Sequence, residues 1–229
     1  MDDEPRISIS DVTKKEGKKG QTTTFTFTVT LSAVYDQAVT MSFRTTDGTA
    51  RTSDSDYVAK AGTLTFAPGE STKTVPILVN GDQLAEPNET FYVNLSSPTS
   101  AVIIRGRGVG TISDDEPRIS ITDVTKAEGK KNRTSLFTFT VTLSAVYDQP
   151  VTVSYRTSDG TATTSDNDYV ARTGTLTFAP GETTKTITIE VKGDSKREAD
   201  ETFFLDLFGN SSNSWFTKRR GVGAILNDD

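Results

Sequence analysis

Residues 25–37 read FTFTVTLSAVYDQ, and the same letters return at residues 137–149. In the first half of this stretch the apolar letters F, F, V and L alternate strictly with threonine. Because successive side chains of a strand point to opposite faces, the alternation predicts an antiparallel strand with one buried and one solvated face. The fold of the chain should therefore be built from such half-buried strands.

The repetition extends over the whole chain. The run DYVA at residues 56–59 returns at 168–171, so the period is 168 − 56 = 112 residues. This is the size of a complete domain, which predicts two copies of one module, each with its own core, at residues 1–115 and 116–229. The acidic seam ISDDEPRISI, residues 112–121, ends the first copy and begins the second.

Further alternating runs follow the first at spacings typical of an all-β sandwich. In copy one they centre on residues 7–9, 39–43, 63–66, 75–79, 91–95 and 109–112, which with residues 24–32 makes about seven strands. No window has a sustained helical period. We therefore predict an all-β chain of two tandem antiparallel β-sandwiches.

The composition excludes several classes of function. The chain has no Cys and no His, which removes thiol nucleophiles, zinc–thiolate sites and the commonest general base. Its net charge of −6 argues against nucleic acid as a partner, since phosphate binding needs a basic surface. No apolar run is long enough to span a bilayer, so we expect no membrane insertion. Paired carboxylates alone do not make an enzyme, and we expect no catalytic activity.

Acidic residues at predicted strand ends are the candidate site. Since strands of a sandwich alternate in direction, alternate loops gather at one pole, and crowded carboxylates there need a cation. Oxygen ligands without nitrogen or sulfur suit Ca²⁺. The candidates in copy one are Glu16, Asp47, Asp82, Glu86, Glu89, Asp114 and Asp115. Those in copy two are Glu128, Asp159, Asp194, Glu198, Glu201, Asp228 and Asp229.

An ordered set of motifs resembles the Calx-β domain family, nearly throughout the chain and twice. Copy one has DGTA at 47–50, DY at 56–57, GTLTFAPGE at 62–70, EPNETF at 86–91 and ISDD at 112–115. Copy two has DGTA at 159–162, DY at 168–169, GTLTFAPGE at 174–182, DETF at 200–203 and ILNDD at 225–229. The resemblance implies immunoglobulin-like sandwiches. It also implies Ca²⁺ ligands among the candidate carboxylates, as in the regulatory domains of sodium–calcium exchangers, where Ca²⁺ binds at the pole where the chain leaves.

The resemblance also implies differences in ion binding. The exchanger pattern has a run of Asp before the equivalent of Glu86, whereas this chain has Asp82 alone. We therefore expect weak Ca²⁺ binding, with a Kd on the order of 10⁻⁴ to 10⁻³ M. In copy two Lys192, Lys196 and Arg197 flank the same loop, and Lys196 is an alternative source of positive charge that would leave this copy without an ion.

Bacterial members of the family occur as arrays in surface and secreted proteins, which implies an extracellular or cell-surface location. Our leading hypothesis is a structural or adhesive spacer whose partners are neighbouring repeats, with Ca²⁺ at the seam stiffening the array. The same spacer without metal is one alternative. Another is a glycan- or surface-protein-binding module of an adhesin or secreted enzyme without functional metal, for which Trp215, Tyr92 and Phe204 are the candidate contact aromatics.

Overall fold

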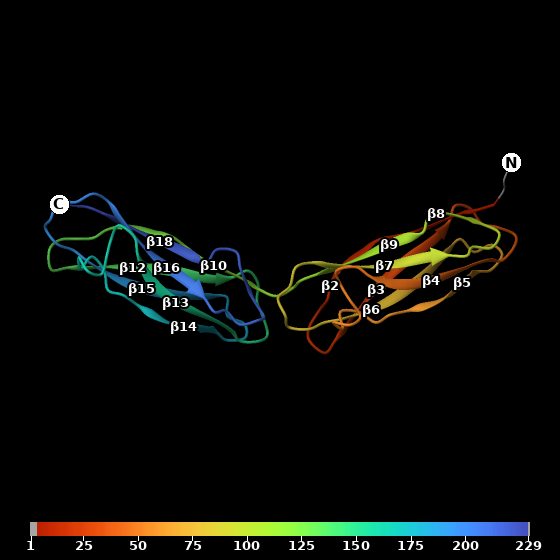
Figure 1. Cartoon of the computed structure of the whole chain (residues 1–229), viewed down its shortest axis with the longest axis horizontal. Helices are drawn as coiled ribbons and strands as arrows, with labels where there is room; N and C mark the ends of the chain where they lie inside the picture. Colours follow the sequence, from red (N-terminus) through yellow and green to blue (C-terminus); the bar gives the residue numbers. More distant parts are fainter. Residues whose placement is uncertain (1–3, 229) are drawn as a thin grey trace. The chain divides into compact units, whose positions relative to one another are not determined.

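The computed structural model describes residues 4–228, and within this range the chain forms strands and no helix (Figure 1). The chain divides into two units, residues 1–115 and 116–229. The strands of unit 1 are β1 (Arg6–Ile9), β2 (Val12–Lys15), β3 (Thr22–Leu31), β4 (Val39–Asp47), β5 (Ala61–Phe66), β6 (Thr72–Asn80), β7 (Glu89–Ser96), β8 (Val102–Arg105) and β9 (Arg107–Ser113). Those of unit 2 are β10 (Arg118–Ile121), β11 (Val124–Ala127), β12 (Thr134–Leu143), β13 (Val151–Asp159), β14 (Thr173–Phe178), β15 (Thr184–Lys192), β16 (Glu201–Phe208), β17 (Trp215–Phe216) and β18 (Arg220–Leu226).

Each unit is a sandwich of a four-stranded and a five-stranded sheet. In unit 1 the strand orders are β6-β3-β1-β8 and β2-β9-β7-β4-β5, and unit 2 repeats them as β15-β12-β10-β17 and β11-β18-β16-β13-β14. This confirms the predicted fold class. Among the described residues each unit has two strands beyond the seven expected, because the short strands β2 and β8, with β11 and β17 in unit 2, were not recognised in the sequence.

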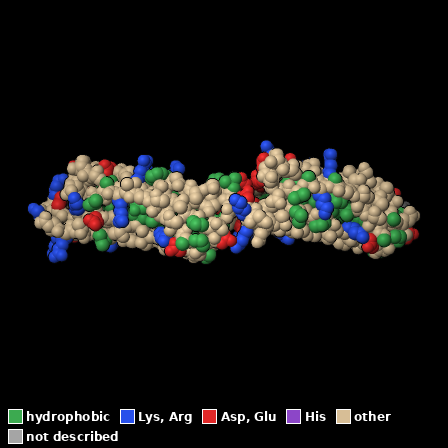
Figure 2. Space-filling model, turned by 90° about the horizontal axis from the view of Figure 1, so that it is seen from below, with side chains coloured by type: hydrophobic (Ala, Val, Ile, Leu, Met, Phe, Trp, Pro, Cys, Tyr) green, Lys and Arg blue, Asp and Glu red, His purple; other side chains and the backbone are tan. Residues whose placement is uncertain are grey.

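The alternation in β3 produces the core of unit 1. Phe25 and Phe27 are fully buried, and both rings contact Phe91 of β7, with centroids 5.7 and 5.8 Å apart. Tyr57 stacks on Phe91, with ring centroids 4.5 Å apart. Unit 2 builds the same cluster around Phe203. The outward positions carry threonine and serine, and Figure 2 shows a surface that is mostly uncharged and polar, with small apolar patches and mixed charges.

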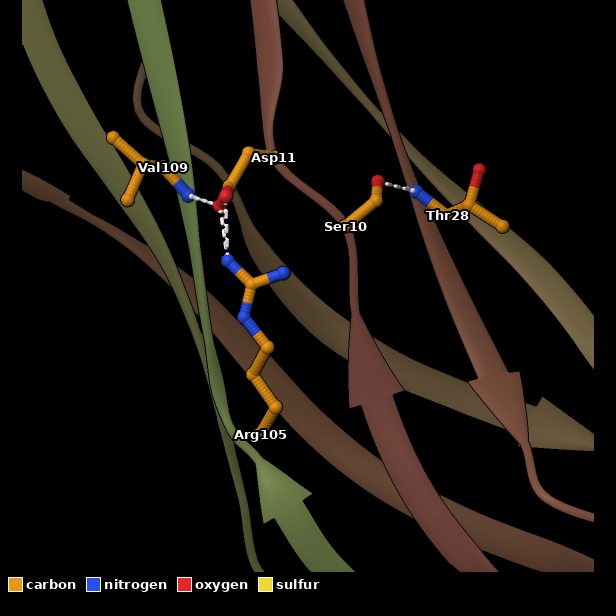
Figure 3. A network of polar contacts seen from close by, with 5 residues as sticks. All are labelled: Ser10, Asp11, Thr28, Arg105 and Val109. Carbon is orange, nitrogen blue, oxygen red and sulfur yellow. Dashed lines mark hydrogen bonds and ion pairs between the residues drawn. The ribbon is translucent and has the colours of Figure 1, made fainter.

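Residues 10–11 carry the chain from one sheet to the other between β1 and β2 (Figure 3). The Ser10 N–H donates to the Thr28 carbonyl and its hydroxyl accepts from the Thr28 N–H, both at 2.9 Å. The Asp11 carboxylate accepts the Val109 N–H at 2.8 Å and pairs with Arg105 at 2.6 Å. The crossing is therefore fastened to both sheets. The matching residues of unit 2 are Thr122, Thr140, Asp123, Val222 and Lys218.

The described residues contain no helix long and apolar enough to cross a membrane.

Candidate metal centre

The sheet pairing brings four connections of unit 1 to one pole. β9 ends beside the start of β7, with Ile112 opposite Glu89, and β4 ends beside the same strand, with Asp47 opposite Phe91. β2 runs parallel to β9, so it ends there too. We call this end, formed by residues 16–21, 47–57, 81–89 and 113–115, the acidic pole of unit 1. All seven carboxylates named as candidates in copy one lie in these segments.

Three carboxylates of the pole come together. Asp56, Glu86 and Glu89 each place an oxygen so that the three atoms lie within 4.8 Å of one another, and all three residues are partly buried. Asp56 was not among the sequence candidates. It lies between β4 and β5, and its only sequence signal is the recurrent DY motif, which marks the loop without indicating where the side chain goes.

The electrostatics of this cluster are unfavourable for three negative charges. Burial, together with the charge and the hydrogen bond of Asp56, raises the pKa of Glu89 to about 7. Burial and the charges of Asp82 and Asp56 also raise the pKa of Glu86. A cation held among these oxygens would offset the repulsion that adds to the effect of burial in both shifts.

Glu16 and Asp115 form a second acidic pair at this pole. Carboxylate oxygens of the two residues lie within 4.8 Å of one another, and Glu16 is buried. Backbone packing holds the Glu16 loop in place, since Gly81 lies so close to Gly17 that an added Cβ would stand 2.2 Å from the Gly17 carbonyl oxygen. Only glycine fits at residue 81, and this contact keeps the Glu16 loop against the β6–β7 connection.

Other predicted ligands shape the loops. The Asp47 carboxylate accepts the Tyr57 hydroxyl at 2.6 Å and the Thr52 N–H at 3.2 Å, and these bonds, that of Tyr57 first, lower the pKa of Asp47. Asp82 accepts the N–H of Leu84 at 2.5 Å, within its own turn. The Asp114 carboxylate accepts the Glu86 N–H at 2.9 Å, which ties the exit of β9 to the β6–β7 connection.

Unit 2 repeats the cluster with Asp168, Glu198 and Glu201, whose oxygens also lie within 4.8 Å of one another. Asp168, like Asp56, was not predicted. The other candidates have these positions: Glu128 is buried, Asp159 accepts the Tyr169 hydroxyl at 2.5 Å, Asp194 accepts the Lys196 N–H at 2.6 Å, and Asp228 accepts the Gly129 N–H at 3.0 Å. Asp229 lies outside the described residues.

The exits of the two units differ in one ligand. Glu89 pairs with Ile112, and Glu201 pairs with Ile225. The two glutamates are 112 residues apart but the two isoleucines are 113 apart, because the segment before β18 is one residue longer than that before β9. Asn227 therefore stands where unit 1 has Asp114. Its side-chain oxygen is buried and has no hydrogen-bond partner, and it lines a small pocket with Glu128, Glu198 and Glu201.

The donors at both poles fit Ca²⁺. They are carboxylate oxygens, with an amide oxygen at Asn227, and they contain no nitrogen or sulfur ligand. Ca²⁺ takes six to eight such oxygens in flexible geometry. Among the described residues, Asp56, Glu86 and Glu89 in unit 1 and Asp168, Glu198 and Glu201 in unit 2 are groups that could hold an ion, and the charge of Asp82 acts on Glu86.

Two of the three aromatic residues suggested for ligand contact are covered on one face. The guanidinium of Arg107 lies 4.8 Å from the Tyr92 ring centre, and that of Arg220 lies 4.6 Å from the Phe204 ring centre. Trp215, at the sheet edge, is 39% exposed. The glycan-binding alternative therefore stays a prediction.

Comparison with known proteins identifies relatives of both units. The sequence model of the Calx-beta domain matches residues 2–106 and 113–222. Sodium/calcium exchanger 1 of Bos taurus is 29% identical over 195 residues, which are 74% of this chain and 19% of the exchanger. Sodium/calcium exchanger 2 of Homo sapiens is 30% identical over 205 residues, which are 80% of this chain and 21% of the exchanger. The chain thus spans about a fifth of the length of these relatives.

Solved structures share the fold. The CBD12 structure of CALX1.2 has a TM-score of 0.54 at 20% identity, and the calcium binding domain CBD12 of CALX1.1 has 0.54 at 18%. Both comparisons cover 96% of this chain and 99% of the other. The relatives are sodium/calcium exchangers and not bacterial surface proteins, so the predicted extracellular or bacterial cell-surface location is wrong.

Proposed function

This chain belongs to the Calx-beta domain family, with two tandem copies of the domain, and from this premise we propose that it is a calcium-binding module in which Ca²⁺ at the acidic pole orders the exit of unit 1. Calx-beta domains are regulatory calcium-binding domains and not catalytic ones, so the chain is not an enzyme. The observation that carries the proposal is the cluster of Asp56, Glu86 and Glu89.

The proposed ligands come from connections that are far apart in the sequence. Asp56, Glu86 and Glu89 form the centre of the site, and Glu16 and Asp115 form its second acidic pair. Asp82 and Asp114 add negative charge near Glu86, and the hydrogen bonds of Asp47, Asp82 and Asp114 fix the loops. With few carboxylates before Glu86, we propose weak affinity, with a Kd on the order of 10⁻⁴ to 10⁻³ M.

The mechanical consequence follows from the position of the exit. Asp114 accepts the Glu86 N–H, and Asp115 is the last residue of unit 1. Glu116 and Pro117 follow at once, and proline restricts both its own φ and the residue before it. Charge neutralisation at the pole would fix the exit run against the β6–β7 connection and so stiffen the covalent link between the units.

Thermal denaturation of the whole chain tests the proposal, once in EDTA and once in about 5 mM CaCl₂, a concentration above the expected Kd. Circular dichroism follows both units, whereas the single tryptophan, Trp215, reports on unit 2 alone. At this concentration, about 5 to 50 times the expected Kd, Ca²⁺ should add about 1 to 2.3 kcal/mol to the stability of the unit that binds it. MgCl₂ should have a much smaller effect.

The matched variants are Glu86→Gln with Glu89→Gln, which should abolish the Ca²⁺ response, and Asp36→Asn, which should retain it. Asp36 is an exposed acid of the β3–β4 connection, at the opposite pole. A Ca²⁺ response that survives the double substitution would contradict the proposed site, and identical melts in EDTA and CaCl₂ would contradict calcium binding altogether. Backbone ¹⁵N relaxation at residues 114–118 tests stiffening, which requires slower motion with Ca²⁺.

A further inference from the structure

The two poles have the same fold but a different charge. In unit 1 the connection between β6 and β7 starts from Asn80 and reads NGDQLAEPNE over residues 80–89, with three acidic residues and no basic one. The equivalent residues 192–201 of unit 2 read KGDSKREADE, with four acidic and three basic residues. The formal charge of this ten-residue segment is therefore −3 in unit 1 and −1 in unit 2.

One of the basic residues contacts the carboxylate cluster itself. Lys196 stands where unit 1 has Leu84, and its ammonium group forms an ion pair with Glu198, a member of the cluster. The backbone N–H of Lys196 also donates to the Asp194 carboxylate at 2.6 Å, which holds this residue at the pole. Leu84 makes no comparable contribution because it is apolar and 45% exposed.

Two other differences also make the unit 2 pole less negative than the unit 1 pole. The Lys192 ammonium donates to the Asn167 side-chain oxygen at 2.5 Å, next to Asp168, where unit 1 has the neutral Asn80. At the exit, neutral Asn227 replaces Asp114. The unit 2 pole thus combines an added cation with a lost anion, while the three clustered carboxylates are retained.

We propose that Lys196 is a built-in counter-cation of the unit 2 pole, so that Ca²⁺ concentrations which load unit 1 leave unit 2 without an ion. This inference rests on the proposed calcium function and assigns Ca²⁺ binding to unit 1 alone. The Lys196 side chain is 69% exposed, so its ion pair adds little to stability. Its effect is on ion binding, because a bound Ca²⁺ would be repelled by the ammonium group that already neutralises Glu198.

The size of the effect follows from Coulomb's law. A single charge and a divalent ion roughly 6 Å apart repel each other in a water-like dielectric enough to weaken binding about tenfold, and more where water is excluded. Exchanging the two residues should therefore exchange the behaviour of the two poles. Lys196→Leu should strengthen Ca²⁺ binding at unit 2 by about tenfold or more, and Leu84→Lys should weaken it at unit 1 to a similar extent.

The experiment compares the full chain and its Lys196→Leu, Leu84→Lys and Lys185→Leu variants. Lys185 is the matched control, because it pairs with Glu182 but lies at the other end of β15. Melting in EDTA and CaCl₂ is followed by Trp215 fluorescence for unit 2 and by circular dichroism for both units, and equilibrium dialysis with ⁴⁵Ca²⁺ counts the bound ions.

In the wild-type chain and in Lys185→Leu, we expect Ca²⁺ to leave the Trp215 transition unchanged and to raise the other transition. In Lys196→Leu the Trp215 transition should rise with Ca²⁺, and dialysis should count additional ions. Adding Glu198→Gln and Glu201→Gln to Lys196→Leu should remove that gain, which shows that the new ions occupy this pole.

A wild-type Trp215 transition that rises with Ca²⁺ as much as that of Lys196→Leu would overturn the inference. A Lys196→Leu chain that folds in EDTA but shows no gain in bound Ca²⁺ would overturn it as well. Failure of the proposed function has a different signature, since the wild-type chain would then bind no Ca²⁺ at unit 1, whatever residue 196 is.

Discussion

Asp56 and Asp168 show how the fold can place a single residue in a way that the local sequence does not indicate. Alternation predicted that Phe25 and Phe27 point inward, because strand periodicity is a local property. Which loop carboxylates meet depends on strand pairing over long sequence distances, so Asp56 and Asp168 escaped prediction. The replacement of Asp114 by Asn227 was hidden by a one-residue insertion that only the β16–β18 register reveals.

At this scale the pKa of Glu89 leads to a prediction about pH. In the folded, metal-free protein burial and Asp56 raise that pKa to about 7, above the ordinary value of 4.5. Between these two values the folded state binds more protons than the unfolded state, so stability is greatest below pH 4.5 as far as this group is concerned and falls as pH rises towards 7. In EDTA, unit 1 should therefore melt at a lower temperature at pH 7.5 than at pH 6.

The Glu89→Gln variant should lose most of this pH dependence, because its side chain cannot ionise. Circular dichroism melts at several pH values measure it, with Glu70→Gln as the control, whose carboxylate pairs with Lys73 outside the acidic pole. An equally steep fall for Glu89→Gln between pH 6 and 7.5 would show that another group is responsible.

Among the elements, the long strands were predictable and the short ones were not. The alternation of apolar and polar residues predicts β3 and β4, whereas β2 reads VTKK and is mostly exposed. β2 is a strand because it pairs with β9, and the pairing depends on the crossing at Ser10 and Asp11. The crossing matters for the site because β2 leads directly to Glu16.

We predict that Asp11→Ala destabilises unit 1 by about 1–2 kcal/mol, because the Val109 N–H loses its acceptor. Arg105→Ala should cost less than about 1 kcal/mol, since the ion pair is about half exposed on both sides. Urea denaturation of the two variants measures the difference. Equal losses would mean that the ion pair, and not the backbone bond, fastens the crossing.

For the whole molecule, the repeat period predicted two separate cores, and the structure has two clusters of buried residues without a shared member. The resemblance to the Calx-β family also predicted an extracellular or bacterial cell-surface location, and that prediction is wrong. Location is not encoded in the packing of a sandwich, so the strand pattern could not supply it. The fold was thus predictable from periodicity, and the motifs marked most of the loops that form the acidic pole.

Separate cores predict separate unfolding. Phe91→Ala should destabilise unit 1 by about 3–5 kcal/mol, because the ring is fully buried among Phe25, Phe27 and Tyr57. The urea midpoint reported by Trp215 should stay where it is in the wild-type chain. Phe203→Ala is the reciprocal variant and should move the Trp215 midpoint. A Trp215 midpoint that shifts in Phe91→Ala would mean that the two units unfold as one.

The identity of β3 and β12 from Phe to Leu has a consequence for folding. β3 pairs with β6 and β12 with β15, but the two central strands share their apolar face and could exchange partners. When both units are unfolded at once, β3 can pair with β15 and β12 with β6. Mispaired intermediates of this kind are a known hazard of tandem repeats. Refolding should therefore be slower and less complete after full denaturation than after selective unfolding of unit 1 in Phe91→Ala. Stopped-flow recovery of the circular dichroism signal would measure the rate and the yield of refolding in the two cases.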